Sequence, residues 1–233
     1  MCNIISGHIN ANQESKDWGK VYLLSGIHHE EDRQNIKETK LIAWETVSPY
    51  IYKYGFRFTH DCGLSIDDKT LQMLMELLEK WAKNNPAEDI IREKFIAVSI
   101  NGKKTEAYTL SVEDKTIIVN NDNCSIIAPL LSEFYITAGD YSTITAGGYS
   151  TIVSGRGSTI TAGYHSTIKA GDHSTIIISG AECNIVISGK QILLTQLYYE
   201  RCCHVRKVID LDQVNGEKYK KGDVINIVKG EIK

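Results

Sequence analysis

The sequence predicts an α+β protein in which a short β-solenoid lies between an N-terminal α/β domain and a C-terminal β-rich cap. Three observations predict this class. The chain contains a tandem eight-residue repeat, a helical pattern and a hairpin signal lie N-terminal to this repeat, and alternating apolar residues lie C-terminal to it. We therefore expect three domains, at residues 1–120, 121–193 and 194–233.

The repeat occupies residues 137–176, where five octads follow one another without a gap. They read TAGDYSTI, TAGGYSTI, VSGRGSTI, TAGYHSTI and KAGDHSTI. A weaker continuation, IISGAECNI at 177–185 and VISGKQIL at 186–193, contains one additional residue. A period of eight gives a helix no constant face, and Thr, Ile and Gly are poor helix formers, so we expect short strands.

Neighbouring side chains in a strand face opposite ways, so the octads predict which residues are buried. If the repeat isoleucines point inward, the preceding serines and the following small residues point inward too, and the threonines point outward. The glycines should then lie in turns, where a positive φ costs them little. The isoleucines are Ile144, Ile152, Ile160, Ile168 and Ile176; the serines are Ser142, Ser150, Ser158, Ser166 and Ser174; the glycines are Gly147, Gly155, Gly163 and Gly171.

One octad is too short to close a coil, so we expect two octads in each coil. Residues 137–193 then form about three coils, roughly 15 Å tall at the usual strand spacing. Both open ends of such a stack need caps, which the flanking sequence should supply.

The octads resemble the repeats of bacterial ice-nucleation proteins over about a quarter of the chain. STITAG at 142–147 and at 158–163 carries the resemblance best. It implies outward Thr-x-Thr rows, here Thr143 with Thr145 and Thr159 with Thr161, but the next row has Ile177 in place of the second threonine. Two intact rows are too few to template ice. Similar repeats also occur in uncharacterised phage and mobile-element proteins, before a small β-rich segment.

The N-terminal region has the signals of an α/β unit. We expect strands at 20–27 and 41–47 and a helix at 66–83, with Ser65 as its cap and Asp68 as the capping-box acid. Asn84 and Pro86 should end this helix.

Two hairpin strands, 94–100 and 103–110, should flank Asn101-Gly102, a typical type I′ turn sequence. A strand at 116–119 and a polar turn at 120–123 follow. The C-terminal region predicts strands at 192–199, 204–211 and 223–228 that cover the last coil.

Composition narrows the function. The formal net charge of −3 gives no general attraction to nucleic acid or to acidic membranes. No apolar stretch is long enough to span a membrane and the N-terminus lacks a signal-peptide pattern, so we expect a cytoplasmic protein. The six cysteines show no CxxC pair and are expected to be buried thiols.

Three groups of residues could carry chemistry, and each has a simpler explanation. His28-His29-Glu30-Glu31-Asp32 could bind a metal, but adjacent side chains point apart and the acids suit a helix start. His60-Asp61-Cys62 and Cys202-Cys203-His204 could hold a Cys–His pair, but sequence neighbours rarely have that geometry. No P-loop or nucleophile-elbow motif is present. We therefore expect no catalytic residues, no metal and no cofactor.

The function that we expect is protein binding through the surface of the solenoid. Its octads are almost uncharged and rich in Thr, Tyr and His, as protein interfaces often are. The expected contact residues are Tyr141, Tyr149, Tyr164, His165, His173, Thr143 and Thr159. The partner could be a host protein, which a phage or mobile-element accessory protein would inhibit as an anti-defence factor, or a second copy in a homodimer.

Two alternatives remain open. The chain could be a virion or assembly protein that oligomerises through the solenoid. It could also be an enzyme whose N-terminal domain uses His28, His29 or His60.

Overall fold

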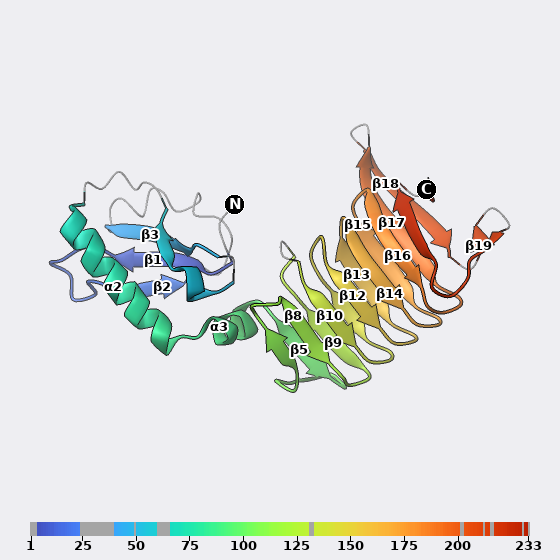
Figure 1. Ribbon diagram of the computed structural model, residues 1–233, viewed down its shortest axis with the longest axis horizontal. Coiled ribbons are helices and arrows are strands. Elements are labelled where there is room, and N and C mark those ends of the chain that lie inside the picture. The colour runs from blue at the N-terminus through green and yellow to red at the C-terminus, as the bar shows by residue number, and fades with distance from the viewer. Residues whose placement is uncertain are drawn as a thin grey trace. The chain divides into compact units, whose positions relative to one another are not determined.

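The computed structural model describes residues 4–23, 40–48, 50–59, 66–130, 133–200, 203–211, 213–214, 217–229 and 231–232 (Figure 1). The chain forms two compact units, residues 1–94 and 95–233. The boundaries expected at 120 and 193 stay predictions.

The first unit contains an antiparallel sheet in the order β2-β1-β3-β4. Its strands are β1 (Ser6–Asn10), β2 (Val21–Leu23), β3 (Leu41–Thr46) and β4 (Phe56–Phe58). A short 3-10 helix, η1 (Tyr52–Tyr54), precedes β4, and the helices α2 (Asp68–Asn84) and α3 (Ala87–Lys94) follow it. The strand expected at 41–47 is confirmed as β3. Of the strand expected at 20–27, residues 24–27 lie outside the described residues.

Helix α2 packs on this sheet through aromatic rings. Trp81 of α2 lies 5.5 Å from Trp44 of β3, centroid to centroid, and Leu74 and Leu78 are fully buried. The expected cap was wrong: Asp67 caps the helix, since its Oδ1 accepts a hydrogen bond from the Thr70 N–H at 2.9 Å. This bond lowers the pKa of the Asp67 carboxyl. Ser65 lies outside the described residues, and α3 was not expected.

The second unit is a β-solenoid with two long sheets. Sheet I has the strand order β22-β21-β16-β14-β12-β10-β8-β7, and sheet II has the order β18-β17-β15-β13-β11-β9-β5-β6. Sheet I contains β7 (Thr109–Ser111), β8 (Thr116–Val119), β10 (Tyr135–Ala138), β12 (Thr151–Ser154), β14 (Ser166–Ala170), β16 (Glu182–Ile187), β21 (Val224–Val228) and β22 (Glu231–Ile232). Sheet II contains β5 (Ala97–Ile100), β6 (Lys103–Lys104), β9 (Cys124–Ile127), β11 (Thr143–Thr145), β13 (Thr159–Gly163), β15 (Thr175–Ser179), β17 (Leu193–Glu200) and β18 (Cys203–Asp210). A small hairpin, β19 (Gln213–Val214) and β20 (Glu217–Lys218), stands apart.

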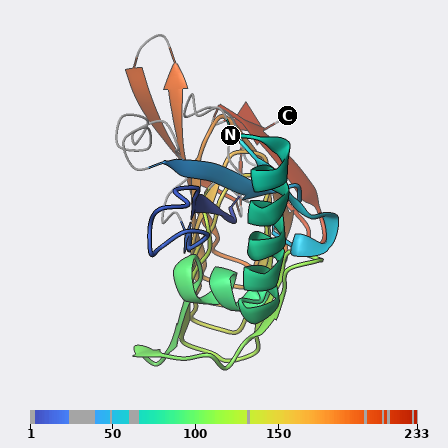
Figure 2. The same cartoon turned by 90° about the vertical axis from the view of Figure 1, so that its left-hand side faces the viewer.

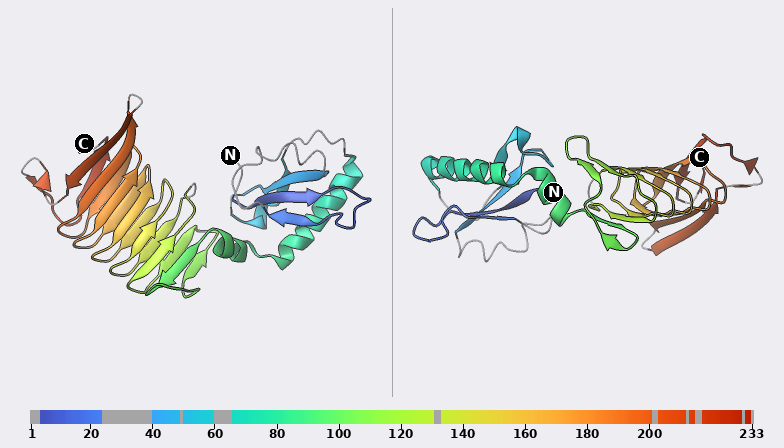
Figure 3. Two further views of the ribbon diagram at one scale, coloured as in Figure 1. Left: turned by 180° about the vertical axis from the view of Figure 1, so that it is seen from behind. Right: turned by 90° about the horizontal axis from the view of Figure 1, so that it is seen from below.

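Each coil contributes one parallel strand to each sheet, as the paired octads predict (Figures 1 and 3). Thr143 pairs with Thr159, and Thr151 pairs with Thr167, in register. The stack has about five coils rather than about three, because β8–β9 precede the octads and β17 follows them. In β8 and β9 the inward Ile117, Val119 and Ile126 are fully buried, so these strands continue the core of the octads.

The inward and outward sides of the repeats are confirmed. All five repeat isoleucines are fully buried, and the repeat serines are at most 1% exposed. The alternating large Ile and small Ser or Ala fill the narrow space between the two sheets, which Figure 2 shows roughly end-on.

The reason expected for the repeat glycines was wrong. The positive φ angles belong to the residue before each serine, for example Tyr149 (58°) and His173 (59°). The glycines are needed for close approach: a Cβ on Gly171 would lie 2.5 Å from the backbone nitrogen of Arg156 in the preceding coil. Each coil therefore passes its neighbour at the glycine with no room for a side chain.

Antiparallel strands cap both ends of the stack. At the N-terminal end β5 pairs with β9 and β7 pairs with β8; at the C-terminal end β18 pairs with β17 and β21 pairs with β16. The β5–β6 turn has positive φ at Asn101 and Gly102, which confirms the expected type I′ turn. The three expected C-terminal strands correspond to β17, β18 and β21.

Candidate functional site

The structure places the expected contact residues on three separate surfaces. Successive octads turn alternately from sheet I to sheet II and back, so their fifth residues alternate between two edges. We call the turns at 120–123, 139–142, 155–158, 171–174 and 188–192 the aspartate edge, and those at 146–150, 163–165 and 180–181 the tyrosine edge. Tyr141 and His173 lie on the aspartate edge, and Tyr149, Tyr164 and His165 on the tyrosine edge. Thr143 and Thr159 lie on the outer face of sheet II.

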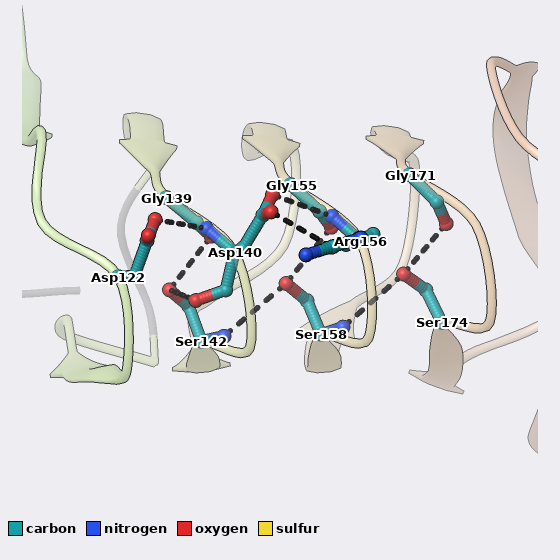
Figure 4. A network of polar contacts seen from close by, with 9 residues as sticks. All are labelled: Asp122, Gly139, Asp140, Ser142, Gly155, Arg156, Ser158, Gly171 and Ser174. Carbon is teal, nitrogen blue, oxygen red and sulfur yellow. Dashed lines mark hydrogen bonds and ion pairs between the residues drawn. The ribbon is translucent and has the colours of Figure 1, made fainter.

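Two ladders of polar contacts run along the aspartate edge (Figure 4). The Ser158 hydroxyl donates to the Gly155 carbonyl at 3.0 Å, and the Ser158 N–H donates to Ser174 Oγ of the next coil at 3.2 Å. Outside this ladder, Asp140 Oδ1 accepts from the Arg156 N–H at 3.0 Å, and its Oδ2 lies 3.1 Å from Arg156 Nε. These contacts hold neighbouring coils in register.

Arg156 also covers an aromatic ring on this edge. Its guanidinium carbon lies 5.4 Å from the centre of the Tyr141 ring. Tyr141 therefore already packs against its own chain, which makes it a structural residue as well as a surface one.

The tyrosine edge carries an exposed cluster of three aromatic side chains. The centroids of Tyr149 and Tyr164 lie 5.1 Å apart, those of Tyr149 and His165 are stacked at 5.1 Å, and those of Tyr164 and His165 lie 5.4 Å apart. Tyr149 is 54% exposed and Tyr164 is 50% exposed. His165 Nδ1 lies 3.6 Å from Glu182 Oε2. We call Tyr149, Tyr164 and His165 the aromatic cluster.

Backbone hydrogen bonds between coils position the residues of the aromatic cluster. The Tyr149 N–H donates to the Tyr164 carbonyl at 2.9 Å, and the His165 N–H donates to the Glu182 carbonyl at 2.8 Å. Both Tyr149 and His165 adopt left-handed φ angles, 58° and 55°. The backbone that carries the three rings is thus held by contacts between coils.

Two cysteines occupy repeat-serine positions outside the five octads, Cys124 at the aspartate edge and Cys183 at the tyrosine edge. Cys183 pairs in register with Ser166, and Cys124 Sγ lies 3.1 Å from Ser142 Oγ. Both are buried free thiols, as expected. Burial raises the pKa of the Cys183 thiol to about 12, with Glu182 adding to the shift.

Cys183 should therefore resist thiol reagents in the folded protein. At neutral pH the raised pKa leaves about a thousandfold less thiolate than an ordinary cysteine has. Peptide mass spectrometry after brief iodoacetamide treatment should find Cys183 unmodified in buffer and modified in denaturant. Modification of Cys183 at the same rate in both conditions would contradict its burial.

The residues proposed for metal binding and for Cys–His chemistry lie mostly outside the described residues. This holds for residues 28–32, 60–62 and 202, and for the side chains of Cys203 and His204. Within the described part of the chain, no group of three His, Cys, Asp or Glu side chains could hold a metal ion. No described helix is long and apolar enough to cross a membrane.

A buried polar row in the first unit was missed. Ser6, His8 and Asn10 alternate along β1 and are at most 8% exposed, and Glu45 lies opposite Ser6 on β3. The Arg57 Nε donates to Glu45 Oε1 at 2.6 Å, which compensates the buried carboxylate. The sequence signal for this buried row was the polar residue at every second position, Ser6, His8 and Asn10.

The second unit belongs to the β-solenoid class, with parallel in-register coils and antiparallel strands at both ends. Comparisons with known protein families, with curated proteins and with solved structures found no match to this chain. The likeness to ice-nucleation repeats thus rests on the octads themselves.

Proposed function

We propose that this chain is a non-enzymatic protein-binding module and that the aromatic cluster is its contact site. The observation that carries the proposal is that Tyr149, Tyr164 and His165 are exposed yet packed on one another. Tyrosines of this kind dominate the binding energy of many interfaces. Because the three rings already pack on one another, we expect them to lose little conformational freedom on binding.

For the partner, we propose a host protein that the module binds and blocks, in the manner of a phage or mobile-element anti-defence protein. The support is the similarity of the octads, followed by a β-rich segment, to uncharacterised proteins of that origin. Such a partner would be found in the cytoplasm of the native host. The rival role, a virion or assembly protein, would instead show large oligomers in light scattering.

The test compares the two edges of the solenoid. We expect Tyr149→Ala with Tyr164→Ala to weaken partner binding at least about 30-fold, the loss of roughly 2 kcal/mol typical of a hot spot. Affinity purification from lysate of the native host, followed by mass spectrometry, identifies the partner, and calorimetry with that purified protein measures the affinity.

Tyr141→Ala is the matched control, because Tyr141 is equally exposed but lies on the aspartate edge. It should leave the affinity within about threefold of the wild type, since distant residues rarely couple. Equal loss in both variants, or binding that survives the double change, would contradict the site. If no host protein is recovered with the wild-type chain in any preparation, the binding proposal itself is wrong.

A further inference from the structure

The outer face of sheet II carries no charge on its five solenoid strands. The outward positions of β9, β11, β13, β15 and β17 hold only Ser, Thr, Ile, Leu and Tyr side chains. The outer face of sheet I, in contrast, contains Lys169 and Glu182.

Exposed apolar side chains gather at the C-terminal end of this uncharged face. Leu193 is 42% exposed and Leu197 is 39% exposed, both on β17, and Val208 on β18 is 56% exposed. The octad frame places Leu193 at an inward isoleucine position. The 188–192 turn contains one more residue than the octads do, so Leu194 lies inward and Leu193 outward.

The positions on this end of the face form a symmetric pattern. Ile177, Thr195 and Val208 lie in one line across β15, β17 and β18. On each strand, the residues two positions before and two positions after this line are similar or complementary. They are Thr175 and Ser179 on β15, Leu193 and Leu197 on β17, and Arg206 and Asp210 on β18. A two-fold axis along the central line would therefore set hydroxyl against hydroxyl, leucine against leucine, and acid against base.

We propose that this face of sheet II binds a second copy of the chain, face to face, with the two-fold axis along Ile177, Thr195 and Val208. Across such an interface Leu193 meets the partner's Leu197, Val208 meets the partner's Val208, and Arg206 meets the partner's Asp210. Self-complementarity of this kind is what an isologous dimer requires. The opposite charges at equal distance from the axis favour a second copy over an unrelated partner.

The small size of the face favours a reversible dimer. From β9 to β18 it spans roughly 24 Å, and with a width of 15–20 Å it offers about 400 Å² on each copy. A standard interface uses about 800 Å² on each partner, so the dimer should be weak and reversible. The tyrosine edge stays free in both copies, so this inference does not depend on the proposed partner.

Sedimentation of the full chain between about 1 and 200 μM tests the dimer. The wild type should shift from monomer to dimer across this range, and Leu197→Lys should raise the Kd at least tenfold. Val153→Lys is the matched control, because Val153 is 38% exposed on the outer face of sheet I. It should leave the Kd unchanged, and thermal unfolding checks that every variant is folded.

A charge exchange tests the position of the axis. In Arg206→Asp alone, the new aspartate faces the partner's Asp210, and this repulsion should raise the Kd at least tenfold. Asp210→Arg alone places two arginines opposite each other and should have the same effect. The double variant, Arg206→Asp with Asp210→Arg, should return the Kd to within about threefold of the wild type. A wild type that stays monomeric at 200 μM, or a double variant no better than the singles, overturns the proposal.

Discussion

Replacement of Gly171 by alanine should lower the free energy of unfolding of the solenoid by about 3 kcal/mol or more, the upper range for overpacking. The new Cβ would lie 2.5 Å from the Arg156 nitrogen and 2.8 Å from its Cα, and backbone atoms cannot move aside as a side chain can. The two coils would have to separate, which would also stretch the bonds from the Gly171 N–H to the Ser154 and Gly155 carbonyls. Urea unfolding followed by circular dichroism measures the loss.

Gly148→Ala is the control for this change. Its Cβ would come no closer than 3.1 Å to Tyr164, whose exposed ring supplies two of the three nearest atoms. We expect a loss below about 1 kcal/mol. A similar loss in both variants would show that glycine serves these turns in some other way than by close approach.

Truncation of an inward isoleucine in the middle of the stack should have the second large effect. Ile160 is fully buried and stacks in register between Ile144 and Ile176, so both neighbours lose contacts when it becomes alanine. The expected loss for Ile160→Ala is about 3–4 kcal/mol, and for Ile160→Val about 1 kcal/mol. Thermal and urea unfolding should both report it.

Thr159→Ala changes the neighbouring side chain on the outer face and should cost less than about 0.5 kcal/mol. The contrast between the two positions tests the assignment of inner and outer sides directly. If Thr159→Ala were as damaging as Ile160→Ala, the inner and outer assignment would be wrong.

The octads predicted the inner residues, the outer residues and the pairing of two octads in each coil. They did so because each position of the octad has the same direction, inward or outward, in every copy of the repeat. The coils without octads were not found in this way: Cys124 occupies a serine position and Ile117 an isoleucine position, but the full Ser-Thr-Ile triplet and the glycine after it are absent there. For the same reason the count of coils was too low.

The division of the contact residues between two edges follows from the pairing itself. With two octads in each coil, the fifth residues of odd octads, such as Tyr141, must lie on one edge and those of even octads, such as Tyr149, on the other. The expected contact residues therefore do not form one continuous patch. The packing of Tyr149 with Tyr164 and His165 also depends on the stacking distance between coils, which the sequence does not give.

The solenoid can change its length without changing its ends. Contacts along the serine ladder join residues sixteen apart, such as Ser142 and Ser158, and the capping strands contact only the first and last coils. Duplication of the gene segment that encodes sixteen residues would therefore insert one coil, about 4.8 Å in height, and preserve both caps. Duplication of a single octad would instead exchange the two edges for all that follows and leave the strands of the C-terminal cap facing the wrong sheets. Recombination within this gene is thus constrained to even numbers of octads.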